Sequence, residues 1–318
     1  MAGPTKRSAY QAEVGEDGRY HHTYRQSTLD SLDLCLERGR LLLTGEMPRT
    51  ETDSTAIGTS AHAAIEYCLT EIRDEDYTPP LGVLQELGQL EFEHLSQLDN
   101  FEYVKHTPEA ARRLVDYCIE SWYLEIMPPL APRAMEFSFD GLLIHEDDER
   151  TIRINGTIDY DDELSGLGDW KTAGQKYQAW EKERWAIQPT VYTLAARIMG
   201  LESAKADRVP FTYYVMTKSG KVRTQTITVY RHQGHWDWLV EKCIAVSKLV
   251  EADLQVWPKN DTSALCSPLY CGAWGTCKGK HYADGWPRLD TPVWVQEPTG
   301  PTGSTGTSED PFVGLGTI

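Results

Sequence analysis

Residues 154–173, with the sequence INGTIDYDDELSGLGDWKTA, constrain the fold of this chain more than any other stretch. Two strand-like pieces flank an acidic turn, and this pattern predicts a β-hairpin. Each strand carries a carboxylate near its end, Asp159 in the first and Asp169 in the second. Because side chains alternate along a strand, Lys171 lies on the same face as Asp169, while Trp170 points into the opposite layer.

The hairpin predicts a site for a divalent cation. If Asp159 and Asp169 meet from neighbouring strands, the two like charges are tolerable only with a cation between them. Mg²⁺ or Mn²⁺ suits such oxygen ligands, and Mg²⁺ also binds phosphate oxygens, so the site suits phosphodiester hydrolysis. Lys171 would then hold or polarise the attacking water. An ordinary hairpin with exposed aspartates and a solvated lysine is the alternative that a short D-x-K motif leaves open.

Three short motifs follow one another here: Gly156-x-x-Asp159, Asp169-x-Lys171 and Gln188-x-x-x-Tyr192. This ordered set resembles the motifs of the RecB-like branch of the PD-(D/E)XK nucleases. The resemblance implies that Asp159, Asp169 and Lys171 are catalytic and that the two aspartates bind the metal. It also implies that the backbone carbonyl of Trp170 adds a ligand. The fold that it implies is α/β, a restriction-endonuclease-like mixed sheet flanked by helices, with a helical N-terminal region.

A histidine upstream of the strands extends the predicted metal site. His62 and Glu66 are four residues apart in a predicted helix, so they share one face of it. By itself, a helical histidine is more often an ordinary surface or core residue than a ligand. Gly58, His62 and Glu66 resemble the family pattern G-x-x-x-H-x-x-x-E, which implies that His62 is a third ligand. Glu66, and Glu136 in the first predicted strand, are auxiliary candidates that also fit ordinary capping or solvated roles.

Gln188 and Tyr192 follow the hairpin on a predicted helix. Pro189 marks either a kink or the first turn of a helix that starts near Gln188. The amide and the hydroxyl share a face, where they are candidates for contacting a phosphate or a base of the substrate. A side-chain pair that ties the helix to the sheet is the alternative. The family resemblance favours substrate contact.

The sequence has seven cysteines, an odd number that argues against a disulfide framework in a cytoplasmic chain. Cys266, Cys271 and Cys277 lie in a short Gly- and Pro-containing loop, and such a cluster is typical of metal ligands. The loop resembles that of RecB-like nucleases with an iron–sulfur cluster, such as the CRISPR-associated exonucleases and the AddB-type helicase–nucleases. In these proteins a fourth cysteine comes from an early helix, which implies Cys35, in the helix predicted to begin at Ser27. We expect a [4Fe–4S] cluster, with structural Zn²⁺ as the alternative because four thiolates suit both.

The predicted organisation has three parts. They are an irregular N-terminal segment (1–26), a nuclease domain (27–290) and a disordered tail (291–318). The nuclease domain is divided into a helical part (27–130), a nuclease core (131–256) and an iron–sulfur closing segment (257–290). The tail is rich in Gly, Thr, Ser and Pro, a composition that cannot build a packed core. The cluster would join the first helix to the closing segment, so losing a cysteine should destabilise the fold.

The net charge of -17 argues against a protein that coats nucleic acid by bulk attraction. Residues 171–223, however, contain ten Lys or Arg against four Asp or Glu. A basic face on an acidic body is compatible with local DNA binding, and an ordinary solvated surface is the alternative. No apolar run reaches membrane-spanning length and the N-terminus lacks a signal-peptide stretch. We therefore expect a cytoplasmic protein without membrane contact, in the host cytoplasm if a phage encodes it.

These patterns predict a divalent-metal-dependent deoxyribonuclease. The resemblance implies exonucleolytic cutting of single-stranded DNA or DNA ends in recombination, repair or phage DNA processing, with recombination or replication proteins as candidate partners. Two alternatives stay open. One is a non-cleaving DNA-binding or assembly module that keeps the fold and a structural metal cluster. The other is a zinc-stapled interaction protein in which the acidic motifs are only surface.

Overall fold

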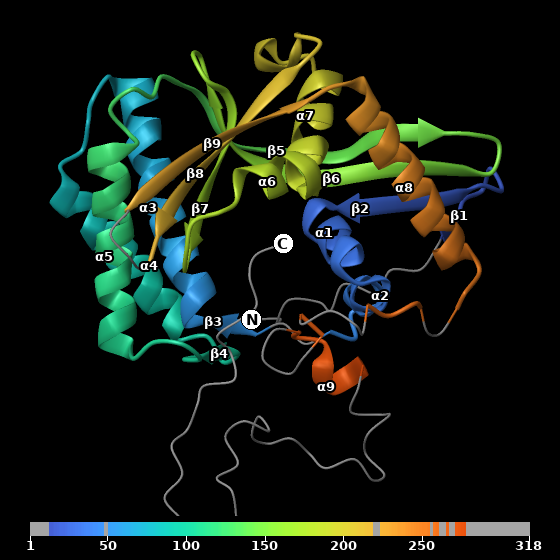
Figure 1. The fold of residues 1–318 in the computed structure, drawn as a ribbon, viewed down its shortest axis with the longest axis horizontal. Helices are drawn as coiled ribbons and strands as arrows, with labels where there is room; N and C mark the ends of the chain where they lie inside the picture. Colours follow the sequence, from blue (N-terminus) through green and yellow to red (C-terminus); the bar gives the residue numbers. More distant parts are fainter. Residues whose placement is uncertain are drawn as a thin grey trace, which may run out of the picture. The chain divides into compact units, whose positions relative to one another are not determined.

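A mixed seven-stranded sheet is the centre of the fold (Figure 1). Its strands are β1 (Glu13–Val14), β2 (Tyr20–Arg25), β5 (Pro132–Glu146), β6 (Arg150–Asp162), β7 (Gly166–Ala173), β8 (Val209–Thr217) and β9 (Thr224–Arg231). The strand order is β1-β2-β6-β7-β8-β9, with β5 paired to the other edge of β6. β2 is parallel to β6 and β7 is parallel to β8, whereas the other neighbours are antiparallel. The predicted mixed sheet is confirmed.

The structure is a computed structural model, and it describes residues 13–47, 50–218, 223–254, 257–260, 265–266 and 271–277. All of these fall within the unit Met1–Cys277. The second unit, Lys278–Ile318, lies outside the described residues. The expected disordered tail and the end of the predicted closing segment therefore lie outside them as well.

Helices cover both faces of the sheet (Figure 1). They are α1 (Gln26–Leu34), α2 (Leu36–Leu43), α3 (Asp53–Glu75), α4 (Leu81–Ser96), α5 (Pro108–Glu125), α6 (Ala179–Trp185), α7 (Ile187–Ile198), α8 (Gln233–Glu251) and α9 (Trp274–Cys277). The short elements are a 3-10 helix (Glu202–Ala204) and a two-stranded sheet of β3 (Glu51–Thr52) and β4 (Phe101–Glu102). One core packs α1, α7 and α8 on the sheet, and the other packs α3, α4 and α5 on its opposite face. The predicted helical part before the core of strands is confirmed.

β6 is shared on one edge between two partners. On that edge, residues 150–155 pair with β2 and residues 160–162 pair with β7. Residues 156–159, the first of the three motifs, lie between these two partners. Beyond its short pairing with β6, β7 runs on beside β8 alone. The two strands therefore separate where Asp159 and Asp169 lie, and the separation leaves room for their side chains.

Glu136 interrupts the regular alternation of β5. Its φ is +43°, in the left-handed region that L side chains rarely adopt. Phe137 and its partner Ile158 pack in the core beside α7, whereas Met135 and its partner Tyr160 pack in the core beside α3. Residues two apart on these strands thus face different layers. The left-handed residue lies at the point where β5 and β6 change the face that they bury.

The expected irregular segment 1–26 is wrong for the residues that the structure describes in it. β1 and β2 extend the sheet, and β2 lies parallel to β6. His22 and Tyr24 of β2 are both 0% exposed. His22 contacts Glu251 of α8 at 2.8 Å, and the Tyr24 hydroxyl lies 2.9 Å from Ser247 Oγ. The inward face of this strand is built from polar and aromatic side chains, so it carries no apolar alternation that a sequence pattern could reveal.

The helix predicted to contain Cys35 is wrong at that residue, because Cys35 separates two helices. Its φ of −166° and ψ of 121° are extended, so α1 ends at Leu34 and α2 begins at Leu36. Asn260 donates its backbone N–H to Cys35 Sγ at 3.4 Å and its side-chain amide to Leu34 O at 3.0 Å. The chain that follows α8 therefore lies beside this break.

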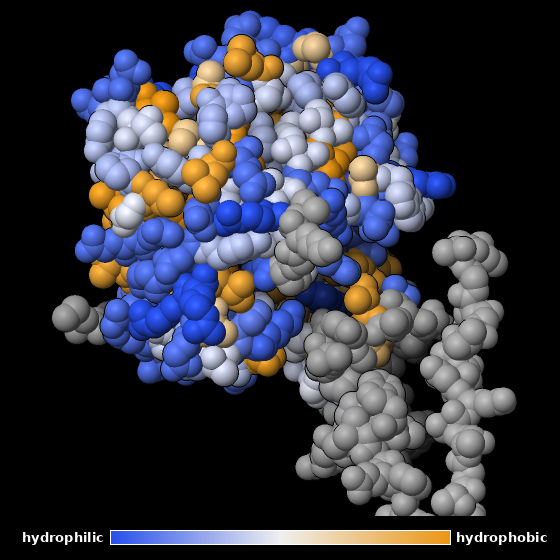
Figure 2. Space-filling view, turned by 60° about the vertical axis from the view of Figure 1, so that its left-hand side comes forward, coloured by the Kyte–Doolittle hydropathy of each residue, from blue (hydrophilic) through white to orange (hydrophobic). Residues whose placement is uncertain are grey.

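Hydrophilic residues cover most of the face drawn in Figure 2, with separate hydrophobic patches between them. Exposed apolar side chains include Leu90 of α4 and Leu124 of α5. Among the described residues, no helix combines the length and the apolar character that a membrane crossing requires.

Candidate active site

The second motif places a carboxylate and an ammonium group in contact. Lys171 Nζ lies 2.8 Å from Asp169 Oδ1 and 2.7 Å from Asp169 Oδ2. Trp170 points the other way and packs edge-on against Trp122 in the core beside α3, α4 and α5. Gln188 of α7 donates its amide to Asp169 Oδ1 at 2.7 Å. Asp169 is 1% exposed, so its charge depends on these two neighbours rather than on water.

Asp159 lies beside Asp169 where β6 and β7 separate. Its Oδ2 accepts a hydrogen bond from the Trp170 N–H at 3.2 Å. Burial raises the pKa of Asp159 well above its ordinary range, and the charge of Asp169 raises it further. The two carboxylates of the hairpin therefore occupy one buried place and repel each other there.

Helix α3 places His62 over the same point. A Cβ atom at Gly58 would lie 3.1 Å from Thr172 Oγ1, so α3 approaches β7 closely one turn before His62. His62 Nε2 lies 2.7 Å from the Trp170 carbonyl oxygen. Because a carbonyl oxygen can only accept, Nε2 carries the proton and Nδ1 carries the lone pair. That Nδ1 faces Asp159 Oδ2 at 3.6 Å.

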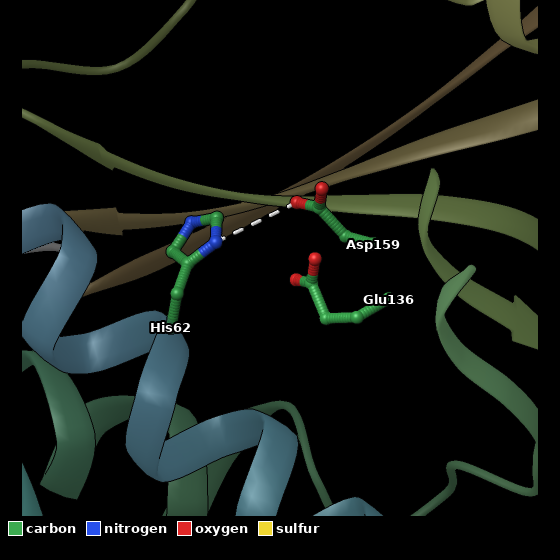
Figure 3. Close-up of side chains that lie close together, drawn as sticks. All are labelled: His62, Glu136 and Asp159. Carbon is green, nitrogen blue, oxygen red and sulfur yellow. Dashed lines mark ion pairs between the residues drawn. The ribbon is translucent and has the colours of Figure 1, made fainter. Parts of the chain in front are cut away.

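His62, Glu136 and Asp159 form the group of potential metal ligands that the described residues bring together (Figure 3). One ligand atom of each residue lies within 4.8 Å of the other two. In Figure 3, His62 rises from α3 toward the Asp159 carboxylate, and the Glu136 carboxylate lies beside both. The sequence marked Glu136 only as an auxiliary candidate. No sequence spacing identifies Glu136 as a ligand, because the backbone of β5 is irregular at the residue that reaches His62 and Asp159.

The charges around this group favour a bound cation. Burial raises the pKa of Glu136 to about 7, and the charges of Glu66 and Asp169 contribute to the rise. Burial lowers the pKa of His62, which keeps its imidazole neutral at pH 7 as a metal ligand must be. Burial also tends to lower the pKa of Lys171, but the charges of Asp169 and Asp159 outweigh it and hold that pKa above its ordinary value. The Lys171 ammonium group thus faces several crowded carboxylates.

This donor set fits a divalent cation. Two carboxylates and one neutral imidazole are ligands for Mg²⁺ or Mn²⁺, and their 4.8 Å convergence is close to twice the ~2.1 Å metal–oxygen distance. His62 Nδ1, Glu136 and Asp159 are the atoms and residues that would hold the ion. The two other expected ligands stay predictions, and in the structure the Trp170 carbonyl accepts from His62 and Asp169 contacts Lys171.

The contact that the structure records for Gln188 is with the protein's own carboxylate. Its amide binds Asp169. Tyr192 is 6% exposed and packs edge-on against Phe139. The Gln188 contact ties α7 to β7, and substrate contact by Gln188 and Tyr192 stays a prediction. Pro189 lies in the first turn of α7, where a missing N–H costs little.

Glu66, the other auxiliary candidate, is exposed on α3 one turn after His62. It lies outside the converging group, although its charge contributes to the raised pKa of Glu136.

The four predicted cluster cysteines come from opposite ends of the described chain. Cys35 lies at the break between α1 and α2, beside Asn260. Cys271 precedes the short α9 and Cys277 is its last residue, and the Cys271 carbonyl accepts from the Trp274 N–H at 2.9 Å. All four cysteines are partly exposed. Within the described residues, their thiols are not part of the group of ligands that converges.

Comparison with protein families agrees with this architecture. A family model described as the PD-(D/E)XK nuclease superfamily matches residues 27–278. Among solved structures, the chain is similar to a protein described as a candidate exonuclease from Eubacterium rectale, with 12% sequence identity and a TM-score of 0.46. That match covers 76% of this chain and 86% of the other. No curated protein matches the chain. The family match spans every residue of the site described above.

Proposed function

Because the chain belongs to the PD-(D/E)XK nuclease superfamily, we propose that it is a divalent-metal-dependent deoxyribonuclease that hydrolyses phosphodiester bonds. One observation carries the proposal: Asp159, Asp169 and Lys171 lie together where β6 and β7 separate, beside His62 and Glu136. Crowding several buried carboxylates costs folding free energy unless a cation compensates for it. A purely structural surface would not need that arrangement.

Each residue of the site has a role in this proposal. When bound, a divalent cation would polarise a phosphate oxygen and help to ionise a water molecule. His62 Nδ1, Glu136 and Asp159 would hold that ion, and the His62 Nε2–H bond to the Trp170 carbonyl keeps the imidazole oriented. Lys171 would orient the attacking water. Asp169 holds the Lys171 ammonium group in place.

Gln188 would act as a positioning residue through Asp169. Its amide takes up one lone pair of Asp169 Oδ1, which limits the orientations that the carboxylate can adopt. Tyr192, one turn after Gln188 on α7, packs edge-on against Phe139. A direct contact of either residue with DNA is the alternative role.

Digestion of labelled DNA tests this function. Single- and double-stranded DNA labelled at the 5′ or the 3′ end would be incubated with Mg²⁺ or Mn²⁺, with the wild type beside Lys171→Ala. We expect metal-dependent products from the wild type alone. Early release of a terminal label as a mononucleotide would support exonucleolytic cutting, whereas internal fragments would support endonucleolytic cutting. DNA binding without products would favour the non-cleaving module, and identical products from both proteins would overturn the proposed chemistry.

We also propose the finer reading that the motif order supports. The resemblance to the RecB-like branch favours an exonuclease acting on single strands or DNA ends in recombination, repair or phage DNA processing. Recombination or replication proteins are the partners that such a setting would supply. Residues 257–290 form the proposed closing segment of the nuclease domain.

A metal centre on Cys35, Cys266, Cys271 and Cys277 is a further part of the proposal, and four thiolates fit either [4Fe–4S] or Zn²⁺ chemically. A contact between the segment after α8 and α2 supports this metal centre: the Trp257 N–H donates to Glu37 Oε2 at 2.8 Å. Metal analysis and visible absorbance of anaerobically purified protein would test it, with Cys271→Ser beside the wild type. Absence of both iron and zinc from the wild type would refute the cluster and leave the nuclease proposal intact.

A further inference from the structure

Two tryptophans face water on α6, the short helix between β7 and α7 (Figure 1). Trp180 is 59% exposed and Trp185 is 56% exposed. The Arg184 guanidinium lies over the Trp185 ring, 4.7 Å from its centroid. Tryptophan is highly buried on average, and exposed aromatic side chains beside arginine are typical of binding surfaces. Two such rings within six residues therefore form a candidate interaction surface.

Helix α6 is only seven residues long, but its inner side is firmly held. Arg231 of β9, which is 1% exposed, donates to the carbonyl oxygens of Lys182 at 3.1 Å and Ala186 at 3.0 Å. The Glu183 carboxylate accepts from the Tyr230 N–H at 3.2 Å. These contacts fix the backbone of the helix to the sheet. Its two tryptophans are thus presented outward from a fixed position, which reduces the entropy lost on binding.

The helix lies close to the candidate active site. The charges of Lys171 and Asp169 both act on the pKa of Lys182, which burial lowers. Gln188, three residues after the end of α6, contacts Asp169 directly. Residues 174–188, which leave out the ion pair of Lys171 with Asp169, contain three Lys or Arg and two Glu, a net charge of +1 in a chain whose net charge is -17. A polyanion that reaches the active site would find a positive and aromatic surface beside it.

We propose that Trp180 and Trp185 stack on unpaired bases of a DNA single strand whose backbone passes the active site. The form of the DNA follows from the rings, because the faces of bases inside a duplex are already covered by their neighbours. Stacking tolerates any sequence, since every base has a π-face, and Arg184 supplies positive charge for the adjoining phosphates. The inference rests on the proposed nuclease function for its ligand and adds which form of DNA is bound and where.

The test separates binding from hydrolysis. The full-length chain would be titrated, without divalent metal, into two fluorescently labelled strands of about 12 nucleotides. One strand is oligothymidylate and the other is its abasic equivalent, which keeps the phosphates and lacks the bases. We expect each of Trp180→Ala and Trp185→Ala to weaken oligothymidylate binding about tenfold, and the double variant about a hundredfold. Affinity for the abasic strand should stay within about twofold of the wild type, since it has no bases to stack.

Matched variants make the result specific. Trp238→Ala on α8 removes another exposed tryptophan that lies beside a cation, with Lys242 Nζ 5.2 Å from its ring centroid. It should leave affinity for both strands unchanged. Trp180→Phe should recover most of the binding, because an aromatic ring can still stack. Unchanged melting temperatures would show that the α6 variants are folded. We expect this result because α6 has no buried residues.

The outcomes distinguish this inference from the proposed function. Wild-type oligothymidylate affinity in the double variant would overturn the stacking surface, and it would leave nuclease activity untouched. An equal loss on both strands would also overturn it, since only phosphate contacts would then have been lost. Tryptophan-dependent binding by a chain that releases no products would support the surface and refute the nuclease. If the double variant still binds DNA but no longer binds a protein partner, the choice of DNA as the ligand would be overturned.

Discussion

The Trp170 N–H donates a hydrogen bond to Asp159 Oδ2 across 3.2 Å, at the place where β6 and β7 stop pairing. The carbonyl of the same tryptophan accepts from His62 Nε2 at 2.7 Å. One peptide segment thereby orients both the carboxylate and the imidazole of the candidate site. The Trp170 side chain packs into the core beside α3, so the orientation of Asp159 and His62 depends on that core.

Lys171→Ala should lower the rate of DNA hydrolysis by about 10²–10⁴, because it removes the ammonium group that contacts both oxygens of Asp169. Lys248→Ala, which removes an exposed lysine on α8, should retain the wild-type rate. Initial rates on labelled DNA with Mn²⁺ would measure both. Equal rates for Lys171→Ala and the wild type would contradict the role assigned to this lysine.

Glu136→Gln should weaken metal binding and stabilise the metal-free protein. Burial raises the pKa of Glu136 to about 7, so at pH 8 the group is ionised against neighbouring negative charges. Removing that charge should raise the melting temperature without metal. Loss of one ligand should increase the Mn²⁺ concentration needed for stabilisation by about ten- to a hundredfold.

Thermal unfolding across a Mn²⁺ titration checks both halves of this prediction, with Ser138→Ala on the same strand as the control. If Glu136→Gln gains as much from Mn²⁺ at low concentration as the wild type, Glu136 is not a ligand.

Gln188→Ala should lower kcat by about tenfold with little change in KM, because Gln188 holds Asp169 rather than substrate. Steady-state kinetics on single-stranded DNA would separate the two constants. A rise in KM at constant kcat would show instead that Gln188 contacts DNA. The split therefore decides between the two roles that the helix position allows.

Gly156→Ala should destabilise the fold by about 1–3 kcal/mol through overpacking. A Cβ atom there would lie 2.6 Å from Phe139 Cζ, closer than carbon atoms can pack, and 3.3 Å from Tyr192 Cε1, a tight contact. Phe139→Leu alone also loses some stability. Combined with Gly156→Ala, however, it should cost less than the sum of the two, since the smaller side chain relieves the clash. Urea unfolding of the four proteins gives this coupling, and strictly additive losses would contradict the predicted contact.

Asp53→Asn should lower the free energy of unfolding by about 2 kcal/mol near neutral pH. Asp53 is 0% exposed and accepts from the Val104 and Lys105 N–H groups, and its other oxygen lies 2.5 Å from His106 Nδ1. Burial tends to raise the pKa of Asp53, but these hydrogen bonds outweigh it and hold that pKa below its ordinary value of 3.8.

The sign of the pH dependence follows from this lowered pKa. The ionised carboxylate stabilises the fold above pH 3.8, and the contribution is lost as the pH falls through the lower folded pKa. The difference between Asp53→Asn and the wild type should therefore narrow below pH 4. Urea midpoints at pH 7 and at pH 3 measure it, with exposed Glu86→Gln as a control that changes little. A difference that widens in acid would contradict the lowered pKa.

The order and faces of the motifs were readable without a structure. Alternation follows from the extended backbone of any strand, so it placed Asp169 and Lys171 together and Trp170 in the opposite core. Helical spacing likewise related His62 to Gly58, where the observed close approach to β7 lies. The family resemblance that the motif order carries also implied the mixed sheet flanked by helices, which is confirmed.

Strand β2 and Glu136 escaped such reasoning for a physical reason. β2 buries His22 and Tyr24 through partners more than 200 residues away, and a local pattern contains no information about them. Glu136 joins His62 and Asp159 at a left-handed residue, where alternation no longer predicts the face. The amino-acid sequence by itself thus determined on which strand or helix each candidate site residue lies. Only the packing of distant segments decided which of them meet, because convergence depends on contacts that local spacing does not encode.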